Sequence, residues 1–290
     1  MLRMGIVGAE NSHCAAIAKL LNVEKALPCR VVSVWGEAPR FAKKAAEAGQ
    51  IPKIVKNWRS MLGEVDGVMI THRHAKYHAE VARFFVKHDV PCFIDKPFTF
   101  TLKEGKSLCR LARKRGVPIV SFSVKVLHET FKDLQKALAD VGTVAFLNST
   151  GPADLKSKYG GVFFYGIHQI DPVIELFGNQ MDTAQILPHG SGGIAVLTYK
   201  NGPVVTINCA NNGSRVFHCT AVGDQGLVDW TFGRDASPYL AGARLFTEMF
   251  QTGKEPIAHE RMLAPIAVLE SLAKSLELGG QPVKVGKVAL

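Results

Sequence analysis

Two short segments of the 290-residue chain combine side chains that could move a proton. In the first, Asp95 and Lys96 directly follow the apolar run 90–94. An ammonium at such a strand end can hydrogen-bond an alcohol or carbonyl oxygen and polarise it as a hydride moves, although a surface lysine explains the same spacing. In the second segment, His168 and Asp171 are three residues apart and therefore share one helix face. The carboxylate could orient the imidazole or bind a substrate hydroxyl. The alternative is that the histidine is buried with its hydrogen bonds made inside the protein, and that the aspartate is favoured by the dipole at the start of the helix.

A loop that could hold phosphate follows the first expected strand. It begins at Gly8 and continues through Glu10, Asn11 and Ser12 into the first expected helix. Backbone N–H groups and the helix dipole bind pyrophosphate at such turns, whose fingerprint is G-x-G-x-x-G. Glu10 and His13 replace the second and third glycines, so the fingerprint is degraded. Asn11 and Ser12 could donate to phosphate or simply cap the helix.

The end of the second expected strand bears on the choice of cofactor. An acidic side chain there binds the ribose hydroxyls of NAD, whereas an arginine favours the 2′-phosphate of NADP. Glu37 and Arg40 are both present, and Gly36 occupies the usual acidic position directly after the strand. The sequence therefore predicts NAD or NADP without choosing between them.

The loop after the fourth expected strand is rich in histidine. Thr71 is followed by His72 and Arg73, and His78 lies in the next expected helix. Because these positions belong to different elements and no carboxylate occurs before Glu80, the pattern argues against a metal site. It favours a basic loop near the phosphates or the nicotinamide ribose, with His78 as a structural partner of a strand-end carbonyl.

The elements that must position these residues alternate regularly in the first 120 residues. Short β-branched runs separated by amphipathic helices are typical of βαβ units and a buried parallel sheet. The expected strands are 3–7, 30–35, 53–55, 67–71, 90–94 and 118–122, and the expected helices are 15–22, 39–48, 77–87 and 103–114. Right-handed crossovers make an α/β fold with a doubly wound Rossmann sheet the predicted architecture.

The rhythm changes after residue 122. Helices are expected at 125–138, 167–176, 238–250 and 259–278, and strands at 142–150, 193–199, 204–209, 216–222 and 227–232. Asn201-Gly202 between two of these strands predicts a tight hairpin. We therefore expect a dinucleotide-binding domain at 1–122 and an α+β domain with a mostly antiparallel sheet at 123–290.

Composition excludes several classes of protein. A hydrophobic fraction of 47% with 21% charged residues is typical of a folded globular chain. The net charge of +10 would suit nucleic acid or an anionic membrane, but no basic block of five residues occurs. Six cysteines without close pairing indicate neither zinc nor a redox pair. Without a signal peptide or an apolar run near 18 residues, we expect a cytoplasmic protein that binds neither nucleic acid nor a membrane.

Taken together, the motifs resemble the Gfo/Idh/MocA oxidoreductases, the superfamily of glucose–fructose oxidoreductase and inositol dehydrogenase. Residues 95–97, Asp-Lys-Pro, resemble the family's E-K-P motif, and residues 166–171 resemble its G-x-H-x-x-D motif. The proline of the first motif would set the turn, with a cis peptide bond as one option. Further matches occur at 5–8, at 68–71, at 252–256 and at 282–285.

The resemblance implies an NAD- or NADP-dependent oxidoreductase that acts on a carbon bearing a hydroxyl, on a sugar or cyclitol. It implies an open C-terminal sheet for substrate binding and for pairing into homodimers or homotetramers. Lys96 would anchor the substrate and relay a proton, His168 would act as acid or base, and Asp171 would lie on the helix of the site. The expected cofactor-binding residues are Gly8, Glu10, Asn11, Ser12, Glu37, Arg40, Thr71, His72, Arg73, Asp95 and Lys96.

Three positions depart from the family pattern. Phe164 stands where an aspartate is common four residues before the histidine, so the proton relay is shorter and the pocket more apolar. The neighbouring Tyr165 could supply a hydroxyl to the substrate. Glu10 and Gly36 are the other departures. Phe164 and Glu10 favour an alternative, a non-catalytic regulatory protein on the same fold that senses a dinucleotide or another ligand.

Overall fold

The computed structural model describes residues 1–211, 213, 215–233 and 235–290. The chain divides into two compact units, and each is described by itself. The first comprises Met1–Phe122, Tyr239–Met262 and Leu290, and the second comprises Ser123–Pro238 and Leu263–Ala289. The division after Phe122 coincides with the expected boundary, but Tyr239–Met262 groups with the first unit. The second unit is therefore not the continuous stretch 123–290.

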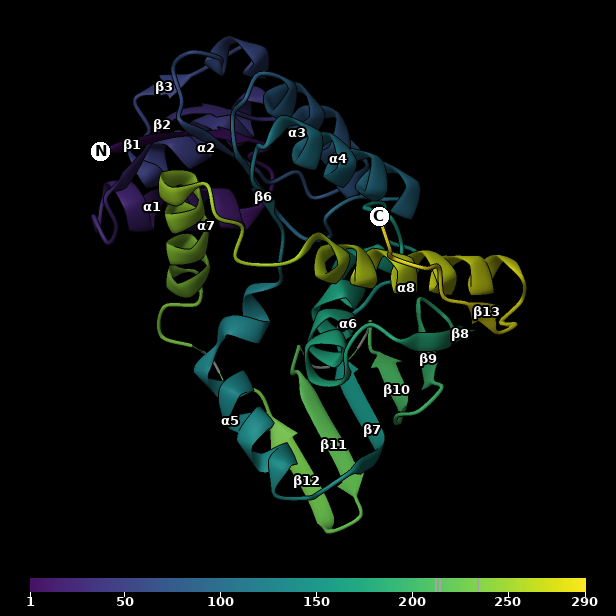
Figure 1. Ribbon diagram of the computed structural model, residues 1–290. Helices are drawn as coiled ribbons and strands as arrows, with labels where there is room; N and C mark the ends of the chain where they lie inside the picture. The colour runs from purple at the N-terminus through teal and green to yellow at the C-terminus, as the bar shows by residue number, and fades with distance from the viewer. Residues whose placement is uncertain (212, 214, 234) are drawn as a thin grey trace. The chain divides into compact units, whose positions relative to one another are not determined.

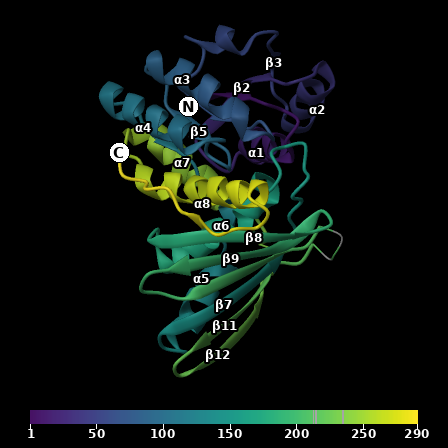
Figure 2. The ribbon, with the colours of Figure 1, turned by 90° about the vertical axis from the view of Figure 1, so that its right-hand side faces the viewer.

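The first unit is built on a parallel sheet of six strands in the order β3-β2-β1-β4-β5-β6. Helices α1 and α2 cover one face of this sheet, and α3 and α4 cover the other (Figure 2). The strand order reverses between β1 and β4, which is the doubly wound Rossmann arrangement that the sequence predicts. The strands are β1 Leu2–Val7, β2 Cys29–Trp35, β3 Lys53–Ile54, β4 Gly67–Ile70, β5 Cys92–Ile94 and β6 Ile119–Val120. The helices are α1 Ser12–Asn22, α2 Pro39–Gly49, α3 His78–Lys87 and α4 Leu102–Arg115, with 3₁₀ turns η1 Trp58–Met61 and η2 Ala75–Tyr77.

Helix α7, Leu240–Thr252, completes the first unit. The Phe246 ring stacks on Phe93 of β5 with the ring centroids 4.7 Å apart. A Cβ at Gly67 of β4 would come within 2.6 Å of the Phe250 ring, so this glycine admits the close approach of the helix. The periodicity of α7 indicates that the helix has an apolar face, but it does not indicate which sheet covers that face. The sequence alone therefore could not assign α7 to the first unit.

Helix α4 explains the densest basic segment of the sequence. The Thr101 hydroxyl accepts from the Glu104 N–H, which caps the start of the helix, and it donates to the Glu104 carboxylate. Arg113, Lys114 and Arg115 occupy the last turn, where the helix dipole favours cations, and Arg113 and Arg115 pair with acidic side chains. These charges therefore stabilise a helix end, and no separate partner is needed to explain them.

The second unit is built on a mixed sheet of seven strands in the order β12-β11-β7-β10-β9-β8-β13. Strands β7 and β10 are parallel and all other pairs are antiparallel, which confirms a mostly antiparallel sheet. The expected Asn201-Gly202 hairpin joins β9 and β10. The strands are β7 Val144–Gly151, β8 Met181–His189, β9 Gly192–Tyr199, β10 Val204–Cys209, β11 His218–Gly223, β12 Gly226–Thr231 and β13 Val283–Lys284.

Helices α5, Glu129–Ala139, and α6, Phe163–Phe177, lie on one face of this sheet (Figure 1). The expected helix 125–138 is divided into two elements. A 3₁₀ turn η3, Val124–Leu127, comes first, and His128 then adopts an extended conformation before α5 begins. Helix α8, His259–Glu277, begins in the first unit and continues in the second. In the part of the chain that the structure describes, no helix has the length and apolar character needed to cross a membrane.

Candidate active site

Gly8 directly follows β1 at the switch point of the Rossmann sheet and has a φ of +103°. A Cβ at this position would lie 2.5 Å from the backbone nitrogen of His72, so only glycine fits. The Gly8 N–H donates to the Trp35 carbonyl over 3.0 Å, and its carbonyl accepts from the Thr71 hydroxyl. These bonds hold the ends of β1, β2 and β4 together at the edge where a doubly wound sheet binds ligands.

Glu37 closes the loop after β1 from the side of β2. Its Oε2 accepts from the N–H groups of Ala9 and Glu10 over 2.9 and 3.0 Å. The N–H groups of Asn11 and Ser12, at the start of α1, have no partner among the described residues. The start of α1 thus presents two open donors, and the carboxylate of Glu37 is fixed beside them.

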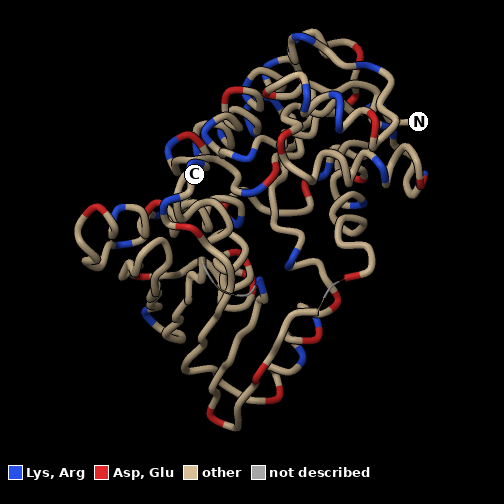
Figure 3. Tube along the Cα trace, turned by 180° about the vertical axis from the view of Figure 1, so that it is seen from behind, with Lys and Arg blue, Asp and Glu red and all other residues tan. Residues whose placement is uncertain are grey.

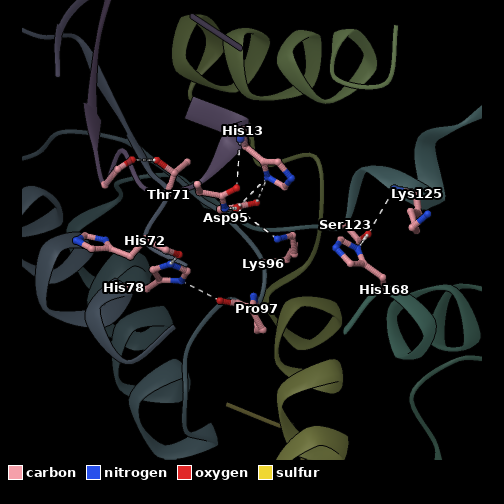
Figure 4. Close-up of polar contacts among 12 residues, drawn as sticks. His13, Thr71, His72, His78, Asp95, Lys96, Pro97, Ser123, Lys125 and His168 are labelled. Carbon is pink, nitrogen blue, oxygen red and sulfur yellow. Dashed lines mark hydrogen bonds and ion pairs between the residues drawn. The ribbon is translucent and has the colours of Figure 1, made fainter. Parts of the chain in front are cut away.

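Asp95 joins the loop after β1 to the candidate catalytic lysine (Figure 4). Its carboxylate, in a residue that is 3% exposed, accepts from Asn11 Nδ2 at 2.7 Å and lies 3.0 Å from His13 Nδ1. The ammonium of Lys96 lies 3.6 Å from the same Oδ2. Burial alone would raise the pKa of Asp95, but the charges of His13 and Lys96 outweigh it and hold the pKa below its usual range. Asp95 is therefore an ionised, buried anchor for Lys96.

His78 clamps the two neighbouring loops of the first unit. Its ring nitrogens lie 2.8 Å from the Pro97 carbonyl and 2.9 Å from the His72 carbonyl (Figure 4). This is the structural role that the sequence indicated for His78. The Lys96–Pro97 peptide bond is cis, as considered from the sequence.

His72 differs from its expected role in a basic loop. Burial lowers its pKa to about 3, so the ring is neutral near pH 7. The ring lies 5.8 Å from that of Trp35 and 5.5 Å from that of Tyr77, and its buried Nδ1 has no hydrogen-bond partner among the described residues. The group could therefore give or accept one hydrogen bond from a bound molecule, but it supplies no charge.

In the second unit, Ser123 connects two polar side chains of α6, His168 and Asp171. Its N–H donates to the Asp171 carboxylate over 3.0 Å, and its hydroxyl lies 3.1 Å from His168 Nδ1 (Figure 4). Since a hydroxyl can either donate or accept, Ser123 can support the imidazole with its proton on either ring nitrogen. Asp171, which is buried, fixes the backbone that carries this hydroxyl. Sequence reasoning missed Ser123, whose signal is its place directly after the last strand of the first sheet.

The start of α6 is bent next to His168. Phe164 and Tyr165 have non-helical dihedrals, and Tyr165 has a φ of +69°. Such a backbone is strained for an aromatic residue, and strain of this kind clusters at functional sites. The Tyr165 ring lies 5.6 Å from the His168 ring, while Phe164 packs between Tyr159 and Tyr165. An aromatic cluster therefore fills the position where the family often has an aspartate.

The expected site residues fall into two sets. The loop ends of the first unit bring together Gly8, Glu10, Asn11, Glu37, Thr71, His72, Asp95 and Lys96, and the second unit brings together Tyr165, His168 and Asp171. Arg40 is exposed on the first turn of α2, with its guanidinium 4.7 Å from the Phe41 ring. His13, which had entered only as the missing third glycine, is a central contact of the first set. No group of three or more histidine, cysteine or acidic side chains that could hold a metal occurs among the described residues.

Residues 2–123 match the model of the oxidoreductase family GFO_IDH_MocA, which is described by its NAD-binding Rossmann fold. UDP-N-acetylglucosamine 3-dehydrogenase of Acidithiobacillus ferrooxidans is 25% identical over 73% of this chain and 64% of its own length. The uncharacterized oxidoreductase YhhX of Escherichia coli is 26% identical over 50% of this chain and 46% of its own. The chain thus aligns with about half to two thirds of the length of these relatives.

Solved structures extend the likeness to the whole fold. Myo-inositol dehydrogenase from Lactobacillus casei, solved with NAD(H) and myo-inositol, is similar with a TM-score of 0.84 and 15% identity. The match covers 100% of this chain and 98% of that structure, so both the Rossmann unit and the mixed sheet are shared. Residues 2–123 are thus similar to the Gfo/Idh/MocA family of oxidoreductases, the family that the sequence motifs resemble.

Proposed function

We propose that the protein is an NAD-dependent oxidoreductase that moves a hydride between nicotinamide and a CH–OH carbon of a sugar- or cyclitol-like substrate. The observation that carries the proposal is the buried Asp95–Lys96 pair beside the open N–H groups of the loop after β1, in a region of an NAD-binding oxidoreductase family. A relative that acts on a nucleotide sugar and a structural neighbour that holds myo-inositol support a polyhydroxy substrate.

The residues of the first unit fit a dinucleotide. Gly8 leaves a space that a side chain would fill, and Asn11 and Ser12 offer two N–H donors to a pyrophosphate. The unpartnered Nδ1 of His72 offers a further polar contact. Glu37 favours NAD over NADP, because its Oε2 is held by the loop while Oε1 remains to accept from ribose hydroxyls, and a carboxylate repels a 2′-phosphate.

When bound, nicotinamide supplies the hydride acceptor or donor at its C4 atom. Lys96 donates a hydrogen bond to the substrate oxygen and stabilises negative charge as the O–H proton leaves, while Asp95 keeps the ammonium in place. His168 is the proposed proton acceptor in oxidation and donor in reduction. Ser123 supports this exchange, since its hydroxyl accepts from Nδ1–H when Nε2 takes the proton. In oxidation the substrate therefore loses a hydride from carbon and a proton from oxygen, which leaves a carbonyl group.

Fluorescence titration with NAD and NADP tests the cofactor. Trp35 lies against His72 and is the expected reporter, so a Trp35→Phe variant should lose the signal while retaining calorimetric binding. We expect NAD to bind at least about 10-fold more tightly than NADP, and Glu37→Gln to narrow this ratio. Absence of binding to either dinucleotide would refute the proposal.

A panel of polyols and sugars, scored by NADH absorbance, tests the chemistry. We expect Lys96→Ala to lower turnover by roughly 10²-fold or more, because positioned proton-handling groups contribute about that much. Undiminished turnover in this variant would refute the assigned role of Lys96. Binding of NAD without turnover of any polyol would instead favour the second candidate function, a non-catalytic sensor protein. The observation that favours this candidate is the packing of Phe164 among Tyr159 and Tyr165.

We further propose that the open face of the second sheet pairs with another copy of the chain. Phe146, Val222 and Leu227 form a row across β7, β11 and β12 and are 58%, 43% and 63% exposed. Lys, Arg, Asp and Glu are sparse along the strands of this sheet (Figure 3). An exposed apolar face of this kind supports association into a homodimer or homotetramer.

A cytoplasmic location is also proposed. All six cysteines are buried and unpaired, and burial raises the pKa of the thiols at Cys14 and Cys209 to about 12. Unreactive, reduced thiols of this kind are typical of proteins kept in a reducing compartment. Fractionation of the producing cells would test the location directly.

A further inference from the structure

The second unit contains a small cavity of about 20 Å³ beside α5, α6, η3 and the sheet, and both His168 and Lys125 line it. Its walls are mainly apolar, with Leu134, Leu147, Val173 and Phe232 among the residues that line it. Two of its polar side chains satisfy each other, because the Ser149 hydroxyl donates to the Gln169 carbonyl oxygen over 2.9 Å, and the Gln169 amide donates to the Gly151 carbonyl. The polar groups of the cavity that bear on a ligand are therefore Lys125 and His168.

Lys125 is a cation without an anion. Its Nζ lies 3.5 Å from the centroid of the Phe217 ring, and no carboxylate among the described residues contacts it. Burial lowers the pKa of Lys125 to about 8, in the direction expected for an ammonium that has lost water and gained no counter-charge. By contrast, Lys96 lies 3.6 Å from the Asp95 carboxylate and is therefore paired.

Desolvated charges in folded proteins are paired, since an unpaired one is costly. A cation–π contact with Phe217 offsets part of this cost, but it does not neutralise the charge. An amine held in this state next to the proposed acid–base histidine is suited to receive an anionic group of a ligand. Lys125 is the sole lysine or arginine among the described residues that line the cavity, and one cation matches a monoanion better than a phosphate dianion.

We propose that Lys125 binds a carboxylate of the substrate, so that the preferred substrate is a hydroxy acid such as a uronate or aldonate rather than a neutral polyol. This inference rests on the proposed function for the identity of the reaction, and on the second unit alone for the carboxylate site. Phe217 has a defined part in it, because its ring face holds the ammonium in place before the acid arrives. Sequence reasoning gave no role to Lys125, which lies two residues after Ser123 in an otherwise apolar segment.

Calorimetric titration of the full chain with matched acid and amide ligands tests the site. The probes are D-glucuronate and D-galacturonate with D-glucuronamide and D-galacturonamide, which differ from the acids only in the charged group. We expect at least one acid to bind the wild type about 10-fold or more tightly than its amide, as for a charge-assisted hydrogen bond. Lys125→Met should bring this ratio to about one, and Lys125→Arg should retain most of it, since only the first removes the charge.

Lys200→Met is the matched control, because it removes an equal charge from an exposed turn of the same unit. It should leave the acid-to-amide ratio unchanged. The proposal is overturned if neither acid is preferred by the wild type, or if the preference persists in Lys125→Met. It is also overturned if Lys125→Met lowers NADH production equally with acidic and neutral substrates, because Lys125 would then transfer protons rather than bind the carboxylate.

The same measurements separate this inference from the proposed function. An acid preference that depends on Lys125 but yields no NADH with any substrate would refute the dehydrogenase and leave the carboxylate site in place. NADH production from a neutral polyol with an unchanged KM in Lys125→Met would refute the carboxylate site and leave the dehydrogenase in place.

Discussion

Replacement of Asp95 by asparagine should destabilise the first unit more than any other single loss of charge in its candidate site. The carboxylate, in a residue 3% exposed, holds Asn11 at 2.7 Å, His13 at 3.0 Å and Lys96 at 3.6 Å. An asparagine cannot accept from all three and places an amide donor against at least one of them. Removing one partner from a buried charged cluster costs about 3–5 kcal/mol. We therefore expect the free energy of unfolding at pH 7 to fall by about that amount.

The loss should depend on pH with a definite sign. The folded-state pKa of Asp95 is below its usual value, so its contribution is complete well above the unfolded value of about 3.9 and is lost as pH falls. The difference between wild type and Asp95→Asn should be constant from pH 7 to about pH 5.5. Below about pH 4 it should shrink by roughly 1.4 kcal/mol for each further pH unit, because the unfolded chain then binds a proton that the folded carboxylate does not.

Urea unfolding followed by circular dichroism measures these differences, and Asp66→Asn is the matched control. Asp66 is likewise paired with a cation of the first unit, since it lies 2.7 Å from Arg3, but its side chain is 40% exposed. An exposed pair contributes about 0–1 kcal/mol, so the control should lose little. Equal losses in the two variants, or a loss below about 1 kcal/mol for Asp95→Asn, would refute the argument that burial makes this carboxylate an anchor.

Two further substitutions test the loop and the open sheet. Gly8→Ala combines a φ of +103° with a Cβ 2.5 Å from the His72 nitrogen, whereas Gly63→Ala has a φ of +83° and open space around it. Urea unfolding should show a fall in the free energy of unfolding of about 1–3 kcal/mol for Gly63→Ala and a larger fall for Gly8→Ala. Of the two variants, only Gly8→Ala should weaken NAD binding. Equal effects of the two substitutions would contradict the close approach of Gly8 to His72. Leu227→Lys should convert the oligomer to monomers in sedimentation, while Leu278→Lys, 48% exposed outside the sheet, should not. A monomeric wild type would contradict the proposed pairing.

The Rossmann half was predictable because its signals are local. Each strand of the first sheet is a short apolar run, and the residues that follow the runs must reach the same sheet edge in a parallel fold. Gly8, Thr71 and Lys96 could therefore be assigned to one edge from sequence position alone. The second unit was harder, since the break at His128 and the bend at Tyr165 depend on packing that no periodicity records.

Contacts between distant residues were beyond the reach of the sequence. Asn11 and Asp95 are 84 positions apart, and Glu37 reaches the loop after β1 from 28 positions away. Helix α7 joins a sheet whose strands end more than a hundred residues earlier, because Phe246 finds its partner in Phe93. In each case the residue type is common in the helix, strand or loop where it lies. Its distant contact partner is determined by the fold and has no signal in the local sequence.

The degraded glycine fingerprint is the clearest example of how such a meeting changes an interpretation. In the sequence, His13 stands in the third glycine position, which degrades the fingerprint, and Asp95 stands where the motif has a glutamate. In the structure they are two halves of one contact, because the imidazole reaches back from α1 to a carboxylate that is one methylene shorter. Asn11 caps α1 by accepting from the His13 N–H and donates to the same carboxylate. The substitutions therefore preserve a buried, ionised partner for Lys96, and a motif that departs at two coupled positions can retain the charge arrangement that its chemistry requires.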